Sequence, residues 1–566
     1  MRKSRSVILG LVLALFSFTV SSVHAADLSD ENWTPIASPG GEGWRSLYLQ
    51  DNSTLNREPS ALFAEYREVN GVFPGVSFHC EDVDSVECVK SPLIYSAAFL
   101  QPCSIDIPIN CIDEVWAIDS EGLRISGVSP VNYPASSKWT YKANTAINLP
   151  EGGTPTVWNI PGVVNGGGTT TYMAQVFAES ELKKDANTKV STEKFTTYKI
   201  SVAITPVKLI SGKYVQQISS DSTQTANKEN RGVQHSSVDE WRYCAMIGDG
   251  DCQQRQAFPE NYRFGLRVKL QSKLTGWLHG RIYDPSVSIS SGSNNSQIIE
   301  VDAQPVRVPV IGEWFKWDDL IQPIKDYILA GKVRGGQGDG RGKALPSGNF
   351  QEMTDPSSQD AMEALRLWLP QIKDKASASP TQWTFRNLVD GDLQNADRCI
   401  RDATDLAGFV TTNAAAYSAG PPAFNKQTQS LDYKVIAPHY TSKGEVAVGT
   451  YDLRIRSDVA RCIYGFSKAP IQASISILSE DGTYQTATQT VDERGGWLSL
   501  SAKGFTYSAP TISVKLSQTQ PVTVAPTPSP RPSTIACGKG KSVKKVTGIG
   551  PKCPKGYTKI VSSRLK

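Results

Sequence analysis

The chain has 566 residues, a net charge of +4 and 39% hydrophobic residues. Its length exceeds what one hydrophobic core normally supports, so a single-domain protein is excluded and three or four domains are expected. Beyond the first 25 residues no apolar run of about 20 residues occurs, so we expect no transmembrane segment in the mature chain.

Residues 1–25 have the pattern of a secretory signal peptide. Arg2, Lys3 and Arg5 precede an apolar run over 7–20, and a small-residue cleavage motif ends at Ala25. A signal peptide is removed on export. We therefore expect a secreted or extracellular protein whose mature chain is soluble.

Ten cysteines, an even number in an exported chain, favour disulfides over free thiols or metal sites. Three pairs share one spacing, which favours local pairing, and the remaining pairs follow by proximity or elimination. The candidates are Cys80/Cys88, Cys103/Cys111, Cys244/Cys252, Cys399/Cys462 and Cys537/Cys553. Cys80 to Cys111 with Cys88 to Cys103 stays open as an alternative.

Residues 26–150 predict a small, cysteine-rich β domain with a strand at 111–118. Nine carboxylates and one lysine lie between positions 79 and 123: Glu81, Asp82, Asp84, Glu87, Asp106, Asp113, Glu114, Asp119, Glu121 and Lys90. Clustered carboxylates can bind calcium, but their spacing matches no calcium loop. A solvated acidic face is the favoured interpretation, and no metal site is predicted.

Residues 151–312 predict a β-sandwich-like domain. Apolar residues alternate with polar or small ones over 198–204 and 263–270, which is typical of half-buried antiparallel strands. Further strands are expected at 172–178, 298–301 and 306–311. Packing two such sheets face to face buries their apolar sides.

Residues 313–400 predict a mixed helical interval. Short helices are expected at 323–330, with Pro323 in the first turn, and at 358–369. The glycine-rich segment between them resembles a phosphate-binding loop, but Gln337 and Ala344 occupy positions that need Gly and Ser or Thr. A flexible exposed loop is the favoured interpretation.

Residues 401–517 predict a second β-sandwich-like domain, because period-two alternation returns at 451–456, 471–478, 497–502 and 511–516. The fold class predicted for the whole chain is mainly β and multidomain. It combines antiparallel β-sandwich-like domains, a small helical interval and a C-terminal proline-rich stalk.

Motifs for catalysis are absent from the sequence: it contains neither G-x-S-x-G nor H-E-x-x-H. Glycoside hydrolysis needs only two suitably spaced carboxylates, and aromatic walls can bind sugar. Glu313, Asp318 and Asp319 lie among Trp314, Phe315 and Trp317, and Asp239 and Glu240 precede Trp241. A secreted carbohydrate-active enzyme, or a carbohydrate-binding protein, is therefore the alternative to a non-enzymatic protein, and no cofactor is predicted.

The chain ends in a proline-rich linker (518–534) and a basic tip (535–566). After Arg494 it carries twelve Lys and Arg and no Asp or Glu, so this end holds +12. Because the N-terminal segment holds +3 and the chain +4, residues 26–494 must hold −11. Charge separation of this kind points to an anionic cell-envelope polymer or surface as partner rather than nucleic acid. The candidate contact residues are Lys539, Lys541, Lys544, Lys545, Lys552, Lys555 and Lys559.

The tip sequence CGKGKSVKKVTGIGPKCPKGYTKI resembles a short C-terminal segment of uncharacterised exported actinobacterial proteins, and DVARCIYGFSKAPIQASISI resembles their last domain. Together these segments cover about a fifth of the chain. The resemblance implies location and architecture, not activity. We therefore expect an exported, envelope-associated, non-enzymatic protein with a binding, adhesion or structural role.

Overall fold

The structure is a computed structural model that divides into two compact units, Met1–Phe466 with Ala473–Leu516, and Ser467–Gln472 with Ser517–Lys566. The predicted signal peptide and most of the predicted proline-rich linker lie outside the described residues. The described residues are 30–33, 39–51, 60–65, 77–136, 140–214, 216–218, 233–235, 243–292, 296–333, 335–338, 347–418, 420–467, 471–478, 484–485, 488–507, 511–518 and 533–560.

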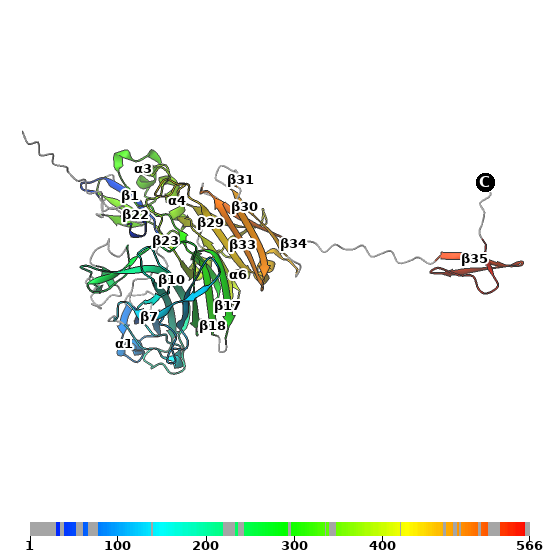
Figure 1. Ribbon diagram of the computed structural model, residues 1–566, viewed down its shortest axis with the longest axis horizontal. Coiled ribbons are helices and arrows are strands. Elements are labelled where there is room, and N and C mark those ends of the chain that lie inside the picture. The colour runs from blue at the N-terminus through cyan, green and yellow to red at the C-terminus, as the bar shows by residue number, and fades with distance from the viewer. Residues whose placement is uncertain are drawn as a thin grey trace, which may run out of the picture. The chain divides into compact units, whose positions relative to one another are not determined.

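The largest sheet contains fifteen of the described strands (Figure 1). Its main path runs β3 (Ser77–Cys80), β2 (Ala61–Glu65), β4 (Leu93–Phe99), β9 (Thr171–Lys183), β10 (Thr196–Ser211), β24 (Thr384–Asn387), β16 (Gly276–Arg281), β25 (Leu406–Thr412), β29 (Gly449–Arg456), β33 (Trp497–Phe505) and β32 (Thr488–Arg494). Side branches are β14 (Asp251–Arg255) with β13 (Cys244–Ile247) on β10, and β8 (Thr156–Asn159) with β7 (Val128–Asn132) on β9. β16 and β25 pair in parallel, whereas the other described pairs of this sheet are antiparallel.

Two further sheets have five and six of the described strands. One runs β17 (Tyr283–Ser291), β18 (Gln297–Gln304), β15 (Arg263–Leu270), β5 (Cys111–Ile118) and β6 (Arg124–Ser126). The other holds β26 (Ala416–Tyr417), β28 (Ser430–Ile436), β34 (Thr511–Gln518), β30 (Ile471–Leu478) and β31 (Tyr484–Gln485), with β27 (Ala423–Asn425) beside β28.

One hydrophobic cluster joins the largest sheet to the five-stranded sheet. Val202 and Phe385 of the largest sheet belong to the same buried cluster as Leu266 and Val301 of the five-stranded one. Two sheets that share one core form a sandwich. The predicted fold class, mainly β with antiparallel sandwich-like packing, is confirmed.

The alternation that predicted β15 is confirmed residue by residue. Phe264, Leu266, Val268 and Leu270 are fully buried, whereas the basic side chains between them are only half-buried. Strands also occupy the other segments where alternation predicted them, although only Val306–Arg307 of 306–311 forms a strand, β19.

Small sheets and short helices complete the described structure. The small sheets are β20 (Trp314–Lys316), β1 (Trp44–Tyr48), β22 (Phe350–Met353) and β21 (Gly336–Gly338); β11 (Gln216–Ile218) with β12 (Val233–His235); and β19 (Val306–Arg307) with β23 (Thr381–Gln382). The helices are η1 (Asp30–Asn32), α1 (Val86–Lys90), η2 (Thr145–Ile147), η4 (Trp317–Asp319), α3 (Gln322–Leu329), α4 (Gln359–Trp368), α5 (Asp390–Leu393), α6 (Arg398–Arg401) and α7 (Ser457–Tyr464).

Helices α3 and α4 confirm the two predicted helices, and Figure 1 shows both near β1 and β22. Pro323 lies in the first turn of α3 as expected. Ser358 caps α4 by accepting a hydrogen bond from the Ala361 N–H at 3.0 Å.

Strand pairing crosses each boundary that the sequence predicted between residues 26 and 517. β4 pairs with β9 across residue 150, β10 pairs with β24 across residue 312, and β16 pairs with β25 across residue 400. The segments 26–150, 151–312, 313–400 and 401–517 are therefore interleaved in one unit rather than folded separately. Alternation identifies a strand and its buried face, but not the strand with which it pairs.

All five favoured disulfides are confirmed: Cys80–Cys88, Cys103–Cys111, Cys244–Cys252, Cys399–Cys462 and Cys537–Cys553. The crossed alternative, Cys80 to Cys111, is not formed. Cys103 precedes β5 and Cys111 begins it, so that pair closes on its own strand.

Candidate functional site

The C-terminal module, defined as residues 533–560, is a three-stranded antiparallel sheet. β35 (Ser533–Lys539) lies between β36 (Ser542–Gly548) and β37 (Thr558–Lys559). Gly540, with φ of 58°, opens the tight turn between β35 and β36. Glycine adopts this left-handed conformation without steric cost.

A disulfide replaces a hydrophobic core in this module. Cys537 is fully buried and is bonded to Cys553, with their Cα atoms 5.7 Å apart. No other described residue of the module is buried. Closing a loop of this length stabilises a fold by about 3 kcal/mol in the chain-entropy model. The covalent bond and the pairing of β36 with β35 therefore hold the lysine-rich segment in place.

All seven predicted contact lysines are exposed in the module: Lys539, Lys541, Lys544, Lys545, Lys552, Lys555 and Lys559. No Asp or Glu occurs in 533–560, so no carboxylate side chain of the module can neutralise them. The Lys544 ammonium lies 5.4 Å from the centre of the Tyr557 ring, which orients that side chain by a cation–π contact. The module therefore presents seven positive charges on a small, disulfide-closed scaffold.

Glu313, Asp318 and Asp319 lie near one another in the chain but differ in environment. Glu313 is half-buried; burial raises its pKa, and the charges of Lys375 and Lys373 oppose the rise. Asp318 and Asp319 are exposed in η4.

The aromatic residues beside these carboxylates already have partners. The Arg45 guanidinium lies 5.6 Å from the centre of the Trp317 ring, and Phe315 lies 6.2 Å from Trp368 in the packing under α4. These contacts resemble core and cation–π packing more than an open platform for a sugar. Catalysis by these carboxylates stays a prediction, and Asp239, Glu240 and Trp241 lie outside the described residues.

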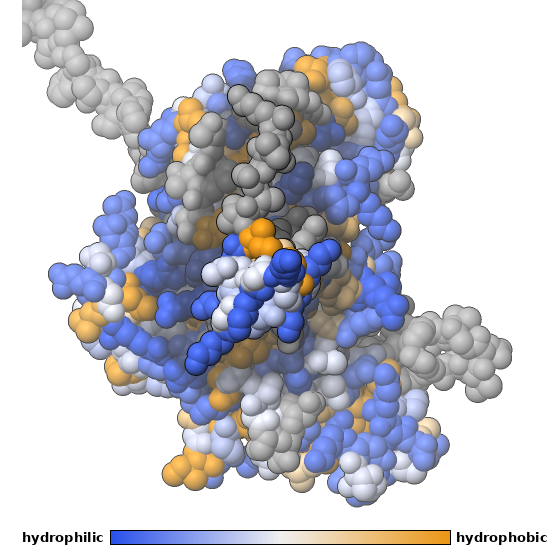
Figure 2. Space-filling view, turned by 90° about the vertical axis from the view of Figure 1, so that its right-hand side faces the viewer, coloured by the Kyte–Doolittle hydropathy of each residue, from blue (hydrophilic) through white to orange (hydrophobic). Residues whose placement is uncertain are grey.

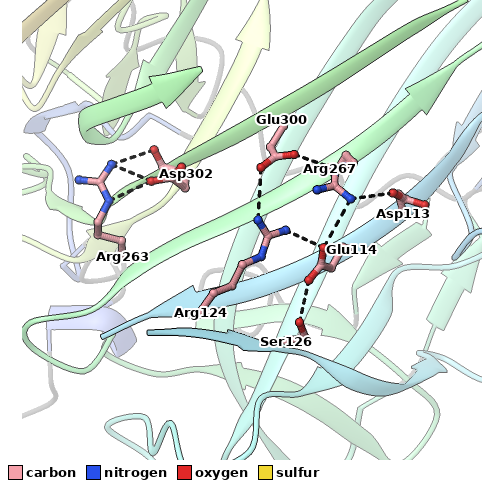
Figure 3. Close-up of polar contacts among 8 residues, drawn as sticks. All are labelled: Asp113, Glu114, Arg124, Ser126, Arg263, Arg267, Glu300 and Asp302. Atoms are coloured by element: carbon pink, nitrogen blue, oxygen red, sulfur yellow. Dashed lines mark hydrogen bonds and ion pairs between the residues drawn. The ribbon is translucent and has the colours of Figure 1, made fainter. Parts of the chain in front are cut away.

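Arginines of the two strands that flank β5 in its sheet neutralise part of the predicted acidic face, as Figure 3 shows. Glu114 binds Arg124 of β6 at 2.6 Å, and Arg124 also reaches Glu300 of β18 at 3.3 Å. Arg267 of β15 binds Glu300 at 2.7 Å and Asp113 at 3.1 Å.

The electrostatics of Asp113 follow from these contacts. Burial alone would raise its pKa, but hydrogen bonds and charge from Lys269 and Arg267 outweigh burial and lower it. The sequence did not reveal this pairing, because the basic partners lie far along the chain. Within the described ranges, no group of three or more His, Cys, Asp or Glu residues is placed to hold a metal ion.

A second polar cluster, which the sequence pattern did not predict, is buried against β16. Arg281 Nε donates to Asp51 Oδ2 at 2.6 Å, and the Tyr417 hydroxyl donates to the same oxygen at 3.2 Å. The His279 ring stacks on Tyr417, with ring centres 4.1 Å apart. The one sequence signal is that His279 and Arg281 occupy alternate positions in an otherwise apolar strand.

This cluster holds its histidine neutral. Burial lowers the pKa of His279, and the nearby charges of Arg281 and Arg386 lower it further. Arg386 is itself bound to Asp392 at 3.1 Å. Asp392 therefore serves as the counter-charge of an arginine.

Comparisons with known proteins give no identification. No family model, no curated protein and no solved structure matches the chain significantly. Among the helices of the described ranges, none has the length and apolar character needed to span a membrane.

Proposed function

We propose that the protein is an exported, non-enzymatic protein of the cell envelope, held there by its C-terminal module. The observation that supports this proposal is the set of seven exposed lysines on a disulfide-closed sheet without any carboxylate side chain. The face of the molecule that Figure 2 shows is largely hydrophilic, with smaller hydrophobic areas between. Positive charges without carboxylates beside them on a small scaffold attract anionic polymers and surfaces. The β-sandwich unit then carries the binding, adhesion or structural role.

The strand geometry favours a flexible polymer over a flat membrane. Lys544 and Lys545 are consecutive in β36, and consecutive side chains of a strand lie on opposite faces of the sheet. A flat surface therefore reaches only part of the lysine set at one time. An extended polyanion can pass around the sheet and contact both faces.

The expected affinity is modest. Each lysine near an anionic surface contributes about 1 kcal/mol, so four lysines give about 4 kcal/mol and a Kd of about 1 mM. All seven would give about 7 kcal/mol and a Kd of about 10 µM. Polymer that surrounds the sheet should therefore bind more tightly than a vesicle of the same charge density.

The test is co-sedimentation of the mature chain with isolated cell envelopes across a salt series. We expect binding that weakens as salt rises from about 0.1 M to 1 M, where the Debye length falls from about 10 Å to 3 Å. A chain that ends at Ser517 should not sediment with the envelopes. Equal sedimentation of both chains would refute attachment through the module.

A charge-matched pair of variants separates the module from the overall charge. The first replaces Lys539, Lys541, Lys544 and Lys545 with Gln and retains both cysteines of the module. The control replaces four exposed lysines of the other unit: Lys142, Lys213, Lys332 and Lys443. Only the first variant should lose binding to envelopes and to soluble polyglutamate, and equal losses would show that net charge alone is responsible.

A further inference from the structure

Three lysines of the C-terminal module share one face of its sheet. Cys537 of β35 lies opposite Lys544 of β36 and opposite Lys559 of β37. Residues that lie opposite one another in antiparallel strands share a face, and so do residues two apart in one strand. Lys539, two residues after Cys537 in β35, is therefore on this face as well. We call Lys539, Lys544 and Lys559 the lysine triad.

The register fixes how close together the triad side chains begin. Lys539 is a diagonal neighbour of each of the other two lysines, and such neighbours are about 7 to 8 Å apart. Lys544 and Lys559 are two strands apart, which corresponds to about 10 Å. These separations do not exceed the Debye length of about 10 Å at 0.1 M salt, so the three charges repel one another. An anion bound among them would relieve this repulsion.

A turn of the module restrains two of these side chains. The Lys544 ammonium lies 5.4 Å from the centre of the Tyr557 ring. The Lys539 ammonium lies 3.3 Å from the position that a Cβ atom would take on Gly556. The Tyr557 N–H donates to the Pro554 carbonyl oxygen at 2.9 Å, which closes the turn. The two ammonium groups are therefore held against consecutive residues of one turn.

The cations of the module are all lysines, because residues 533–560 contain no arginine. The planar fork of an arginine fits the two coplanar oxygens of a carboxylate, whereas each lysine is a compact point charge. A phosphate group is tetrahedral and directs its charged oxygens to different sides, so separate ammonium groups can approach it at once. The triad is therefore better suited to phosphate than to carboxylate.

We propose that the lysine triad binds phosphate groups of an extended polymer in preference to carboxylate groups. This inference rests on the proposed function, in which the module contacts an anionic polymer, and it names the chemical class of that polymer. Phospholipid headgroups are the other source of phosphate. A flat membrane can meet the triad but not Lys545, which follows Lys544 in β36 and lies on the opposite face of the sheet.

The test is calorimetric titration of the mature protein with polyphosphate and polyglutamate chains of equal charge at constant ionic strength. One additional charge-assisted hydrogen bond should make polyphosphate bind about tenfold more tightly. Equal affinities would overturn the preference for phosphate but leave the proposed function intact, whereas no binding of either polymer would overturn both. Tighter binding to phosphatidylglycerol vesicles than to polyphosphate would overturn the polymer as the source of phosphate.

Two variants of equal charge assign the preference to the triad. The first replaces all three triad lysines with Gln, and it should bind polyphosphate no more tightly than polyglutamate. The control replaces three other lysines of the module with Gln: Lys541, Lys545 and Lys552. The control should bind both polymers more weakly than the wild type but keep the preference. Equal loss of the preference in both variants would overturn the assignment to the triad.

A third variant changes the arrangement of the lysines without changing their charge. Cys537→Ser with Cys553→Ser opens the disulfide of the module and keeps every lysine. Polyglutamate should still bind, because the charge is the same, whereas the preference for polyphosphate should be lost. A preference that survives in this variant would overturn the role of the fixed arrangement.

Discussion

The buried ion pair of Asp51 and Arg281 provides the strongest test of how the interior is held together. Their side chains are only 3% and 2% exposed, and the Arg281 guanidinium also lies 4.2 Å from the centre of the Tyr417 ring. Asp51→Asn keeps the size of the side chain but leaves the Arg281 charge buried without its counter-ion. Breaking a buried pair in this way typically costs about 3 to 5 kcal/mol.

The expected shift in thermal midpoint follows from the size of the unit. A unit of roughly 500 residues has an unfolding entropy of about 1 kcal/mol per degree if it unfolds cooperatively. Asp51→Asn should therefore lower the midpoint by about 3 to 5 °C. Calorimetry of the mature chain measures this shift directly.

Two further variants separate the charge effect from a general loss of contacts. Asp402→Asn breaks an exposed ion pair, in which Arg398 Nε lies 2.8 Å from Asp402 Oδ2. The side chains of Arg398 and Asp402 are 85% and 60% exposed, so this variant should leave the thermal midpoint unchanged. The double variant Asp51→Asn with Arg281→Met removes both buried charges and should be more stable than Asp51→Asn alone. A shift no larger than that of Asp402→Asn, or strictly additive effects in the double variant, would refute the reasoning.

Three other predictions concern the same unit. His279 is neutral in the folded protein and can take up a proton below about pH 6.5 only on unfolding, so the free energy of unfolding should fall by up to about 1.4 kcal/mol per pH unit below that value. His279→Gln should flatten this dependence. The same pH dependence in wild type and variant would contradict the prediction. Replacing Cys399 and Cys462 with Ser opens a loop with a sequence separation of 63 and should cost about 4 kcal/mol in denaturant unfolding, so an unchanged midpoint would count against it. Gly408→Ala would place a methyl group 2.3 Å from the buried Trp277 indole of β16 and should lower the free energy of unfolding by about 1 to 3 kcal/mol. Gly391→Ala is the control, because no atom lies within 4 Å of the added methyl group, and its thermal midpoint should not change.

Sequence reasoning predicted the strands well because a half-buried strand records its own burial. In β15 the buried set Phe264, Leu266, Val268 and Leu270 is visible as alternation in the order of the residues alone. The disulfides were predictable for a similar reason, since four of the five pairs are close in the chain and the fifth followed by elimination. The exposed lysines of the C-terminal module needed no tertiary information either.

Strand partners were not predictable in the same way. Nothing in β5 indicates that it pairs with β15, more than a hundred residues later, or that the arginines of β15 and β6 neutralise its carboxylates. Pairing depends on which apolar faces meet during folding, and a face can meet any other of suitable length. The predicted domain boundaries therefore followed local composition, while the sheets ignored them.

The remaining features follow from strands that are covered on both sides. All six residues of β16 are buried, although two of them, His279 and Arg281, have polar side chains. The polar residues of such a strand must then find partners inside the protein, as Arg281 does with Asp51. Arg255 is buried in the same unit, and its Nε and Nη2 atoms have no hydrogen-bond partner among the described residues. An alternation pattern reports which residues of a strand are buried but not which polar groups they meet, so neither environment was predictable from the sequence.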